Sequence, residues 1–278
     1  MRAPDKLFGG YVFDLDGTVY LGDVLLPEAS ETLAALKDRS SVVYLTNKPL
    51  ETPANYAAKL TRLGVEARAD EVISSTDALL MYLGRCVPGT RLFVVGEPPL
   101  IQLLTLAGYA VAQDAEGVDV VVVSFDRTFD YRKLKTSFDA VRAGARIVAT
   151  NPDAYCPTPD GGGLPDCAAM LAAIEASTGI RAEAIVGKPS PHMAATLLDR
   201  LGVPARDTLL VGDRLATDIR MANEAGMASA LVLTGATALE EARSSEDQPD
   251  YVIENLGELL PRGDGHGAAA PAPDKRDR

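Results

Sequence analysis

Short runs of branched apolar residues, each followed by a stretch with helical spacing, constrain the fold of this chain most strongly. Several of these runs are continuously apolar, which is typical of parallel strands whose sheet is covered by helices on both faces. Strands that alternate with helices build such a sheet. The sequence therefore predicts an α/β protein with strands at residues 11–14, 42–46, 91–95, 118–124, 146–150, 184–186, 208–211 and 229–233.

Charge and hydropathy limit the partners of the chain. Lys and Arg total 27 and Asp and Glu total 39, so the formal net charge is −12 and the chain repels the phosphates of a nucleic acid. No apolar run reaches the length of about 18 residues that a membrane span requires. The first ten residues lack the basic and apolar regions of a signal peptide. We therefore expect a cytoplasmic protein that binds neither nucleic acids nor membranes.

Cysteine and histidine are too few for several classes of site. The cysteines Cys86, Cys156 and Cys167 form no CxxC pair, so we expect reduced thiols rather than disulfides or a thiolate zinc site. Only two histidines occur, His192 and His266, so a Ser-His-Asp triad or a multi-histidine metal site would depend almost entirely on His192. The phosphate loop GxxxxGK(S/T) and the GxGxxG turn are both missing. What remains as candidate chemistry is a set of carboxylates.

Two carboxylates follow the first predicted strand directly. Asp14 and Asp16 stand two positions apart in the segment YVFDLDGT, and residues i and i+2 of an extended chain point to the same side. Both should face the space beyond the carboxyl end of the strand, where open α/β sheets bind ligands. A calcium loop of the EF-hand type does not fit, because its glycine comes sixth whereas Gly17 comes fourth. Alone, the pair could equally be a solvated turn.

Three further predicted strands end in polar residues. Thr46 and Asn47 follow one strand, Lys188 follows another within GKPSP, and Asp213 and Asp218 belong to GDRLATD. Each segment alone has an ordinary explanation, such as a turn or a solvated lysine. Together they place a hydroxyl group, an ammonium group and oxygen ligands at strand ends.

The segments DLDGT, TN, GKPS and GDRLATD, in this order, resemble the motifs of the haloacid dehalogenase superfamily of phosphatases. The region between them, with NPD at 151–153 and GGGLP at 161–165, looks like the α/β cap of the NagD-like branch, subfamily IIA. The resemblance implies a Rossmann-like parallel-sheet core with an inserted α/β cap of the C2a type. The implied boundaries are residues 1–82 and 182–262 for the core and residues 83–181 for the cap.

Two expectations accompany this domain organisation. Residues 263–278 are rich in glycine, alanine and proline and have no apolar periodicity, so we expect a disordered tail. Caps of this kind often pair with one another, so the resemblance also implies a homodimer formed through the cap.

The charge of a phosphate ester favours the same site. Asp14 is ionised at neutral pH and can attack phosphorus to form an aspartyl phosphate without a base. A substrate at about −2, together with Asp14 and Asp213, brings the local charge to about −4, which Lys188 and one divalent cation offset to about −1. We therefore expect Mg²⁺ as the cofactor, because it prefers oxygen ligands.

The resemblance implies a role for each carboxylate. Asp14 is the nucleophile, and Asp16 protonates the departing alcohol and later takes a proton from water. The metal ligands are the Asp14 carboxylate, the backbone carbonyl of Asp16 and the Asp213 carboxylate. Relatives often have an aspartate where this chain has Ala216, so Asp218 takes the second carboxylate role and orients Lys188 or a metal-bound water.

The remaining implied contacts are those to the substrate. Thr46, Asn47 and Lys188 hold the phosphoryl group. The segment NPDAYCPTPD at 151–160 looks like the cap loop that hangs over the cleft, and we hypothesise that Tyr155 and Cys156 face the leaving group. Alternatively, Tyr155 packs inside the cap and Cys156 is a small buried apolar residue. This loop offers no platform of several aromatic rings, which disfavours nucleotides.

The implied function is Mg²⁺-dependent hydrolysis of small phosphorylated metabolites. Met193 and Ala194 after GKPS, together with ALVLTG at 230–235, are most similar to broad-range sugar phosphatases of this branch. Alternatives within the branch are pyridoxal phosphate or phosphoglycolate phosphatases. More remote alternatives are a phosphotransferase or mutase that uses the same aspartyl phosphate, and a non-catalytic protein that binds a phosphate ligand.

Overall fold

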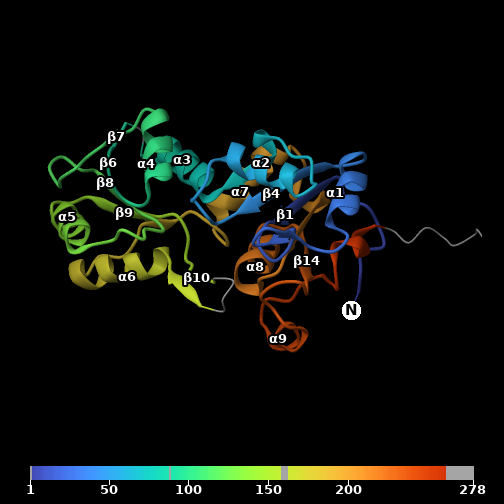
Figure 1. The fold of residues 1–278 in the computed structure, drawn as a ribbon. Helices are drawn as coiled ribbons and strands as arrows, with labels where there is room; N and C mark the ends of the chain where they lie inside the picture. The colour runs from blue at the N-terminus through green and yellow to red at the C-terminus, as the bar shows by residue number, and fades with distance from the viewer. Residues whose placement is uncertain (1, 88, 158–161, 261–278) are drawn as a thin grey trace, which may run out of the picture.

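The computed structural model of the chain describes residues 2–87, 89–157 and 162–260. Two lobes lie side by side, and each is built on a parallel sheet (Figure 1). The blue N-terminal and the orange C-terminal parts of the chain together form the larger lobe, whereas the green and yellow middle part forms the smaller one. The predicted α/β class, with a Rossmann-like core and a second α/β unit, is confirmed. The predicted tail at 263–278 and residues 158–160 of the predicted cap loop lie outside the described residues.

The larger sheet has six strands in the order β15-β14-β13-β1-β4-β5. Its centre joins distant parts of the sequence, because Gly10 pairs with Thr208 on one side and with Ser41 on the other. Every residue of the central strand β1 is buried, which explains its continuous apolar sequence. The six strands are β1 (Gly10–Asp14), β4 (Ser41–Thr46), β5 (Val72–Ser74), β13 (Thr208–Gly212), β14 (Ala228–Val232) and β15 (Tyr251–Ile253).

Helices cover this sheet, and local sequence fixes where some of them begin. The Thr52 side chain accepts a hydrogen bond from the backbone N–H of Asn55 at 3.2 Å, and Pro53 occupies the first turn, so Thr52 is the N-cap of α2. Among the described residues, no helix is long and apolar enough to cross a membrane. The helices of this lobe include α1 (Ala29–Lys37), α2 (Pro53–Arg62), α3 (Ser75–Cys86), α7 (Pro191–Leu201), α8 (Arg220–Glu224) and α9 (Leu239–Ser244).

The smaller sheet has five strands in the order β12-β9-β8-β6-β7. Along its central strand, Val121 and Val123 pack with α5 and α6, whereas Val120 and Val122 join a different apolar cluster on the opposite face. This arrangement explains a strand made of four consecutive valines. The elements of this lobe are β6 (Arg91–Val95), α4 (Pro98–Leu106), β7 (Ala110–Val111), β8 (Val120–Val123), α5 (Tyr131–Arg142), β9 (Arg146–Ala149), α6 (Cys167–Thr178) and β12 (Ala184–Ile185).

The two lobes share apolar packing. One cluster of buried side chains contains Val12 and Leu45 of the larger sheet together with Leu92 and Val122 of the smaller one, joined through α3 and α7. The predicted core resumes at residue 182. In the structure, β12 begins at Ala184 and still pairs with β9 of the smaller sheet. Burial of this shared cluster holds the lobes in one arrangement.

Apart from β12, which was predicted at 184–186, the sequence patterns did not reveal the shortest strands. These strands have two or three residues, too few for a period of apolar residues to be recognised. They are β5, β7 and β15, and the hairpin strands β2 (Tyr20–Leu21), β3 (Val24–Leu25), β10 (Tyr155–Pro157) and β11 (Gly163–Pro165).

Candidate active site

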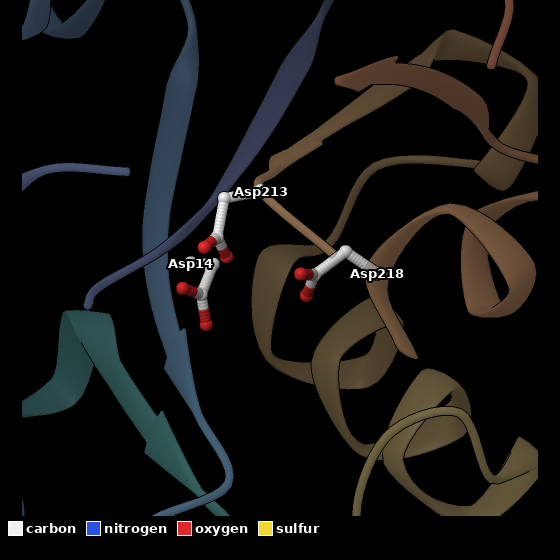
Figure 2. Close-up of side chains that lie close together, drawn as sticks. All are labelled: Asp14, Asp213 and Asp218. Atoms are coloured by element: carbon white, nitrogen blue, oxygen red, sulfur yellow. The ribbon is translucent and has the colours of Figure 1, made fainter. Parts of the chain in front are cut away.

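Three strands of the larger sheet carry candidate residues at their carboxyl ends. Asp14 is the last residue of β1, Thr46 is the last residue of β4, and Asp213 directly follows β13. Because these strands are parallel neighbours, their ends meet at one sheet edge. Figure 2 shows that Asp218 turns its carboxylate toward those of Asp14 and Asp213. Each of the three offers an oxygen within 4.8 Å of the others, an arrangement that could hold a cation.

The Asp213 carboxylate has the environment of a metal ligand. Its Oδ2 accepts a hydrogen bond from the backbone N–H of Ala236 at 2.6 Å, whereas its Oδ1 is buried without a hydrogen-bond partner among the described residues. Burial raises the pKa of Asp213 to about 6, and the neighbouring Asp218 adds to this effect. A buried oxygen without a donor is costly, and a cation would satisfy it. The residues present therefore fit Mg²⁺, which prefers oxygen ligands.

Two glycines allow the backbone to approach this carboxylate. Gly17 has a φ of 88°, and a Cβ atom added there would lie 2.5 Å from Oδ2 of Asp213. A Cβ atom added to Gly235 would also overlap the Asp213 side chain. Any larger residue at either position would displace Asp213 or the chain around it, so the DGT turn and the loop after β14 both need glycine.

Lys188 connects the nucleophile candidate with the second carboxylate. The lysine is 3% exposed, and its Nζ forms ion pairs with Asp14 and, at 2.7 Å, with Oδ1 of Asp218. Burial alone would lower the pKa of Lys188, but Asp14 and Asp218 raise it above its ordinary value, so the side chain stays charged. Oδ2 of Asp218 accepts a hydrogen bond from the backbone N–H of Arg214 at 3.2 Å. Asp218 is thus fixed at both oxygens and is placed to orient Lys188.

Asp14 lies in a buried position that it shares with other charged groups. Burial is the main cause that raises its pKa well above the ordinary value, Lys188 opposes this shift, and Asp218 and Asp213 add to it. The repulsion among the three carboxylates is therefore a smaller contribution to the same shift. A divalent cation at this edge would relieve that repulsion.

Thr46 and Asn47 lie beside these groups, but their side chains already have protein partners. Thr46 Oγ1 accepts a hydrogen bond from the Lys48 backbone at 3.1 Å. The Asn47 amide donates to Oδ2 of Asp153 at 3.1 Å and to the Lys188 carbonyl at 3.2 Å, and its Oδ1 accepts from the Lys188 backbone N–H at 2.8 Å. Asn47 therefore ties together three loops, two of the larger lobe and one of the smaller.

A cavity of about 870 Å³ opens above this edge of the sheet and is lined by residues of both lobes. Asp14, Asp16 and Lys188 line it from the larger lobe, and Tyr155 and Cys156 on β10 line it from the smaller one. Tyr155 is 60% exposed, so it does not pack inside the smaller lobe. The two cap-loop residues therefore lie where a leaving group could contact them.

Besides Asp23 and Lys59, four further charged residues line the same cavity and were not singled out from the sequence: Lys48, Arg214, Asp153 and Asp166. Lys48 forms an ion pair with Asp16, and Arg214 lies 3.9 Å from Asp153. Lys48 directly follows the TN motif, and Asp153 is the last residue of the NPD motif. Their positions next to or within these motifs could have indicated that both residues lie at the site. The fourth, Asp166, has no comparable signal, because only the folding of the smaller lobe brings it to the cavity.

Comparison with known proteins identifies the family. A family model described as "Haloacid dehalogenase-like hydrolase" matches residues 11–110, and a second model, for HAD-hydrolase-like proteins, matches residues 185–259. The chain is 35% identical over 251 residues to the sugar-phosphatase AraL of Bacillus subtilis, covering 90% of this chain and 91% of that protein. The chain belongs to the haloacid dehalogenase-like hydrolases.

Solved structures place this hydrolase in the NagD-like branch. NagD from E. coli K-12 has a TM-score of 0.84 at 30% identity, with 92% of this chain and 99% of that chain covered. A 4-nitrophenylphosphatase from Thermotoga maritima has a TM-score of 0.85 at 38% identity, with coverage of 91% and 96%. A glycerol phosphate phosphatase from Mycobacterium tuberculosis, in complex with magnesium, has a TM-score of 0.85 at 32% identity, with coverage of 93% and 78%. The predicted membership of this branch and the predicted phosphatase class are confirmed.

The cavity wall of this hydrolase contains a carboxylate that makes folding depend on pH. Asp166 is 5% exposed, and its Oδ1 accepts a hydrogen bond from the backbone N–H of Cys167 at 2.5 Å, which caps α6. Burial raises the pKa of Asp166 from 3.8 to about 6. The folded protein therefore keeps a proton that the unfolded chain releases, so the free energy of unfolding falls as pH rises from about 4 to about 6.

Asparagine at this position should remove that pH dependence. Asp166→Asn keeps an acceptor oxygen for the cap without the charge, so we expect its free energy of unfolding to exceed that of the wild type by about 1–2 kcal/mol at about pH 7.5. Near pH 4 the two proteins should differ least. Urea unfolding at several pH values measures this difference, and a difference that does not grow with pH would contradict the assignment.

Proposed function

We propose that this hydrolase is a Mg²⁺-dependent phosphomonoesterase that acts on small phosphorylated metabolites, sugar phosphates first, through an aspartyl-phosphate intermediate. One observation carries the proposal: the buried Lys188 ammonium contacts Asp14 and Asp218, and Oδ1 of Asp213, which has no hydrogen-bond partner in the part of the chain that the structure describes, lies on the wall of the same cavity. A phosphate dianion needs a nucleophile, a cation and an ammonium group around one phosphorus atom, and this edge of the sheet has residues for all three.

The chemistry proceeds in two steps. Asp14 attacks phosphorus, the bond from phosphorus to the ester oxygen breaks, and Asp16 gives its proton to the departing alcohol. Asp16 then takes a proton from water, whose oxygen attacks phosphorus and releases inorganic phosphate and free Asp14. Lys188 balances negative charge on the phosphoryl group in both steps, and Asp218 holds Lys188 in place.

Mg²⁺ would be held by the Asp14 and Asp213 carboxylates and the Asp16 carbonyl. Once bound, it would neutralise charge on the phosphoryl oxygens. Thr46 and the loop that Asn47 orders would border the phosphoryl group. These roles agree with the buried positions of Asp14 and Asp213 and with the orphaned Oδ1 of Asp213.

The smaller lobe, residues 83–181 in the predicted division, would act as the cap that selects the leaving group. Tyr155 and Cys156 line the same cavity as the catalytic carboxylates, which supports their proposed contact with that group. The cavity volume of about 870 Å³ suits a small metabolite. Relatives named sugar phosphatase and glycerol phosphate phosphatase favour polyhydroxylated leaving groups. Pyridoxal phosphate and phosphoglycolate are the alternatives.

A panel assay tests the proposal. The purified chain with Mg²⁺ should release inorganic phosphate from at least one of several sugar phosphates, glycerol phosphate, phosphoglycolate, pyridoxal phosphate and 4-nitrophenyl phosphate. EDTA should lower the rate by at least about 100-fold, because removal of the cation leaves the carboxylate charge uncompensated. Added Mg²⁺ should restore the rate. Release of phosphate at an undiminished rate in EDTA would contradict the metal requirement, and no release from any ester would contradict the function.

A further inference from the structure

Lys48 is a cation of the cavity to which the proposed reaction assigns no role. It follows Asn47 directly in the chain and lines the cavity. Its Nζ lies 3.1 Å from Oδ2 of Asp16, the residue proposed to protonate the leaving group. The Lys48 side chain is 30% exposed, so a ligand in the cavity can reach it.

The backbone fixes the position of Lys48 from both sides. Its N–H donates to Oγ1 of Thr46 at 3.1 Å, and its carbonyl accepts a hydrogen bond from the Tyr56 hydroxyl at 3.1 Å. Thr46 ends β4 and Tyr56 is a buried residue of α2, so the turn between them is anchored to two regular elements. An ammonium group on such a turn is partly ordered before any ligand binds, which lowers the cost of binding.

The distance from Lys48 to the reacting bond follows from its contact with Asp16. A general acid approaches the oxygen that it protonates to about 3 Å. Since Nζ of Lys48 lies 3.1 Å from Oδ2 of Asp16, it lies within about 6 Å of the ester oxygen when Oδ2 carries the proton. Groups on the first carbon atoms of the leaving group fall within this reach. An ammonium group has three donors and no acceptor, and it binds an anionic acceptor more strongly than a neutral one.

Lys48 and Lys188 pair with different carboxylates of the cavity. Lys188 pairs with the carboxylates around the phosphoryl position, whereas Lys48 pairs with Asp16 on the leaving-group side. A lysine ammonium group is ordinarily charged at neutral pH, and the ion pair with Asp16 favours this charged form.

We propose that Lys48 is a specificity-determining residue: it binds an anionic group on the carbon next to the ester oxygen, and it favours phosphorylated hydroxy acids over phosphate esters of the same size whose leaving group is uncharged. The inference rests on the phosphatase function proposed above, and it ranks phosphorylated hydroxy acids such as phosphoglycolate above the sugar phosphates named first there.

Two esters of matched size test the inference. Phosphoglycolate and ethyl phosphate differ in that a carboxylate of the first replaces a methyl group of the second. Lys48→Gln should lower the ratio of kcat/KM for phosphoglycolate to kcat/KM for ethyl phosphate about tenfold, which corresponds to about 1.4 kcal/mol. Lys48→Arg, which keeps the charge, should retain most of the ratio.

Lys59→Gln is the matched control. Lys59 lines the same cavity from α2, but its Nζ lies 3.7 Å from Asp23 and 4.0 Å from the centre of the Tyr20 ring, not beside Asp16. This variant makes the same change in net charge, and its ratio should stay within about twofold of the wild type, because long-range charge effects are screened.

A binding measurement separates the inference from the proposed function. The protein cannot hydrolyse 3-phosphonopropionate or propylphosphonate, so calorimetric titration with these two ligands measures affinity without turnover. Lys48→Gln should lower the affinity for 3-phosphonopropionate and leave the affinity for propylphosphonate unchanged. An equal loss of affinity for both ligands, or an equal loss of kcat/KM for both esters, would show that Lys48 acts through Asp16 and would overturn the inference. Equal shifts of the ratio in Lys48→Gln and Lys59→Gln would also overturn it. Failure of the wild type to hydrolyse any ester would contradict the phosphatase function instead.

Discussion

Replacing Asp14 by asparagine should lower the rate of phosphate release by at least about 10⁴-fold, because the amide cannot form the aspartyl phosphate. The fold should survive this change. Lys188 keeps its ion pair with Asp218, and the variant removes a buried carboxylate whose pKa burial raises. Steady-state release of inorganic phosphate with Mg²⁺ measures the loss, and urea unfolding confirms that the variant is folded.

Asp16→Asn provides the matched comparison, because it removes the proton donor and leaves the nucleophile. With 4-nitrophenyl phosphate, whose leaving group needs little protonation, this variant should still form the phosphoenzyme but hydrolyse it slowly. Acid quenching should then trap labelled phosphate on Asp16→Asn and none on Asp14→Asn. Turnover of Asp14→Asn at the wild-type rate, or trapped phosphate on that variant, would remove Asp14 from the mechanism.

The sequence predicted the longer strands of both sheets because they are buried on both faces. Continuous apolar runs such as β1 and β8 are buried on both faces of their sheets, so their composition alone marks them as strands. The three-residue strands β5 and β15 lack that signal, since they lie at the edges of the larger sheet and owe their conformation to a neighbouring strand.

The site carboxylates could be predicted for a related reason. Asp14 and Asp213 directly end apolar strands, and parallel pairing then brings them together whatever the loops do. Lys48 and Asp166 could not be predicted, because their contacts depend on how separate loops approach one another. Asn47 was expected at the phosphoryl group, yet its amide makes three hydrogen bonds that join loops, which no linear pattern records.

Replacing Lys188 by methionine should destabilise the fold as well as abolish activity. The lysine and Asp218 side chains are 4% and 1% exposed, so the change leaves buried carboxylates without their cation. Breaking such a pair costs about 3–5 kcal/mol. The measurement is urea unfolding in EDTA, because a bound divalent cation would stabilise the same carboxylates and hide part of the loss.

The pH dependence identifies the cause of that loss. Burial already raises the pKa of Asp213 to about 6 and that of Asp14 above its ordinary value, and loss of Lys188 removes an opposing charge. When folding raises the pKa of a carboxyl group, the free energy of unfolding of the protein falls as pH rises from the pKa in the unfolded chain to the pKa in the folded protein. Lys188→Met should therefore lose more of its free energy of unfolding between about pH 5 and pH 8 than the wild type does.

A double-mutant cycle separates lost charge from lost packing. Adding Asp218→Asn to Lys188→Met removes one of the uncompensated carboxylates, so the double variant should recover about 1–3 kcal/mol at pH 8. Methionine keeps most of the apolar volume of the lysine stem, so packing is nearly constant through the cycle. A single-variant cost that is small and independent of pH would mean that Lys188 does not neutralise the buried carboxylates, and the charge balance proposed for the reaction would then be wrong.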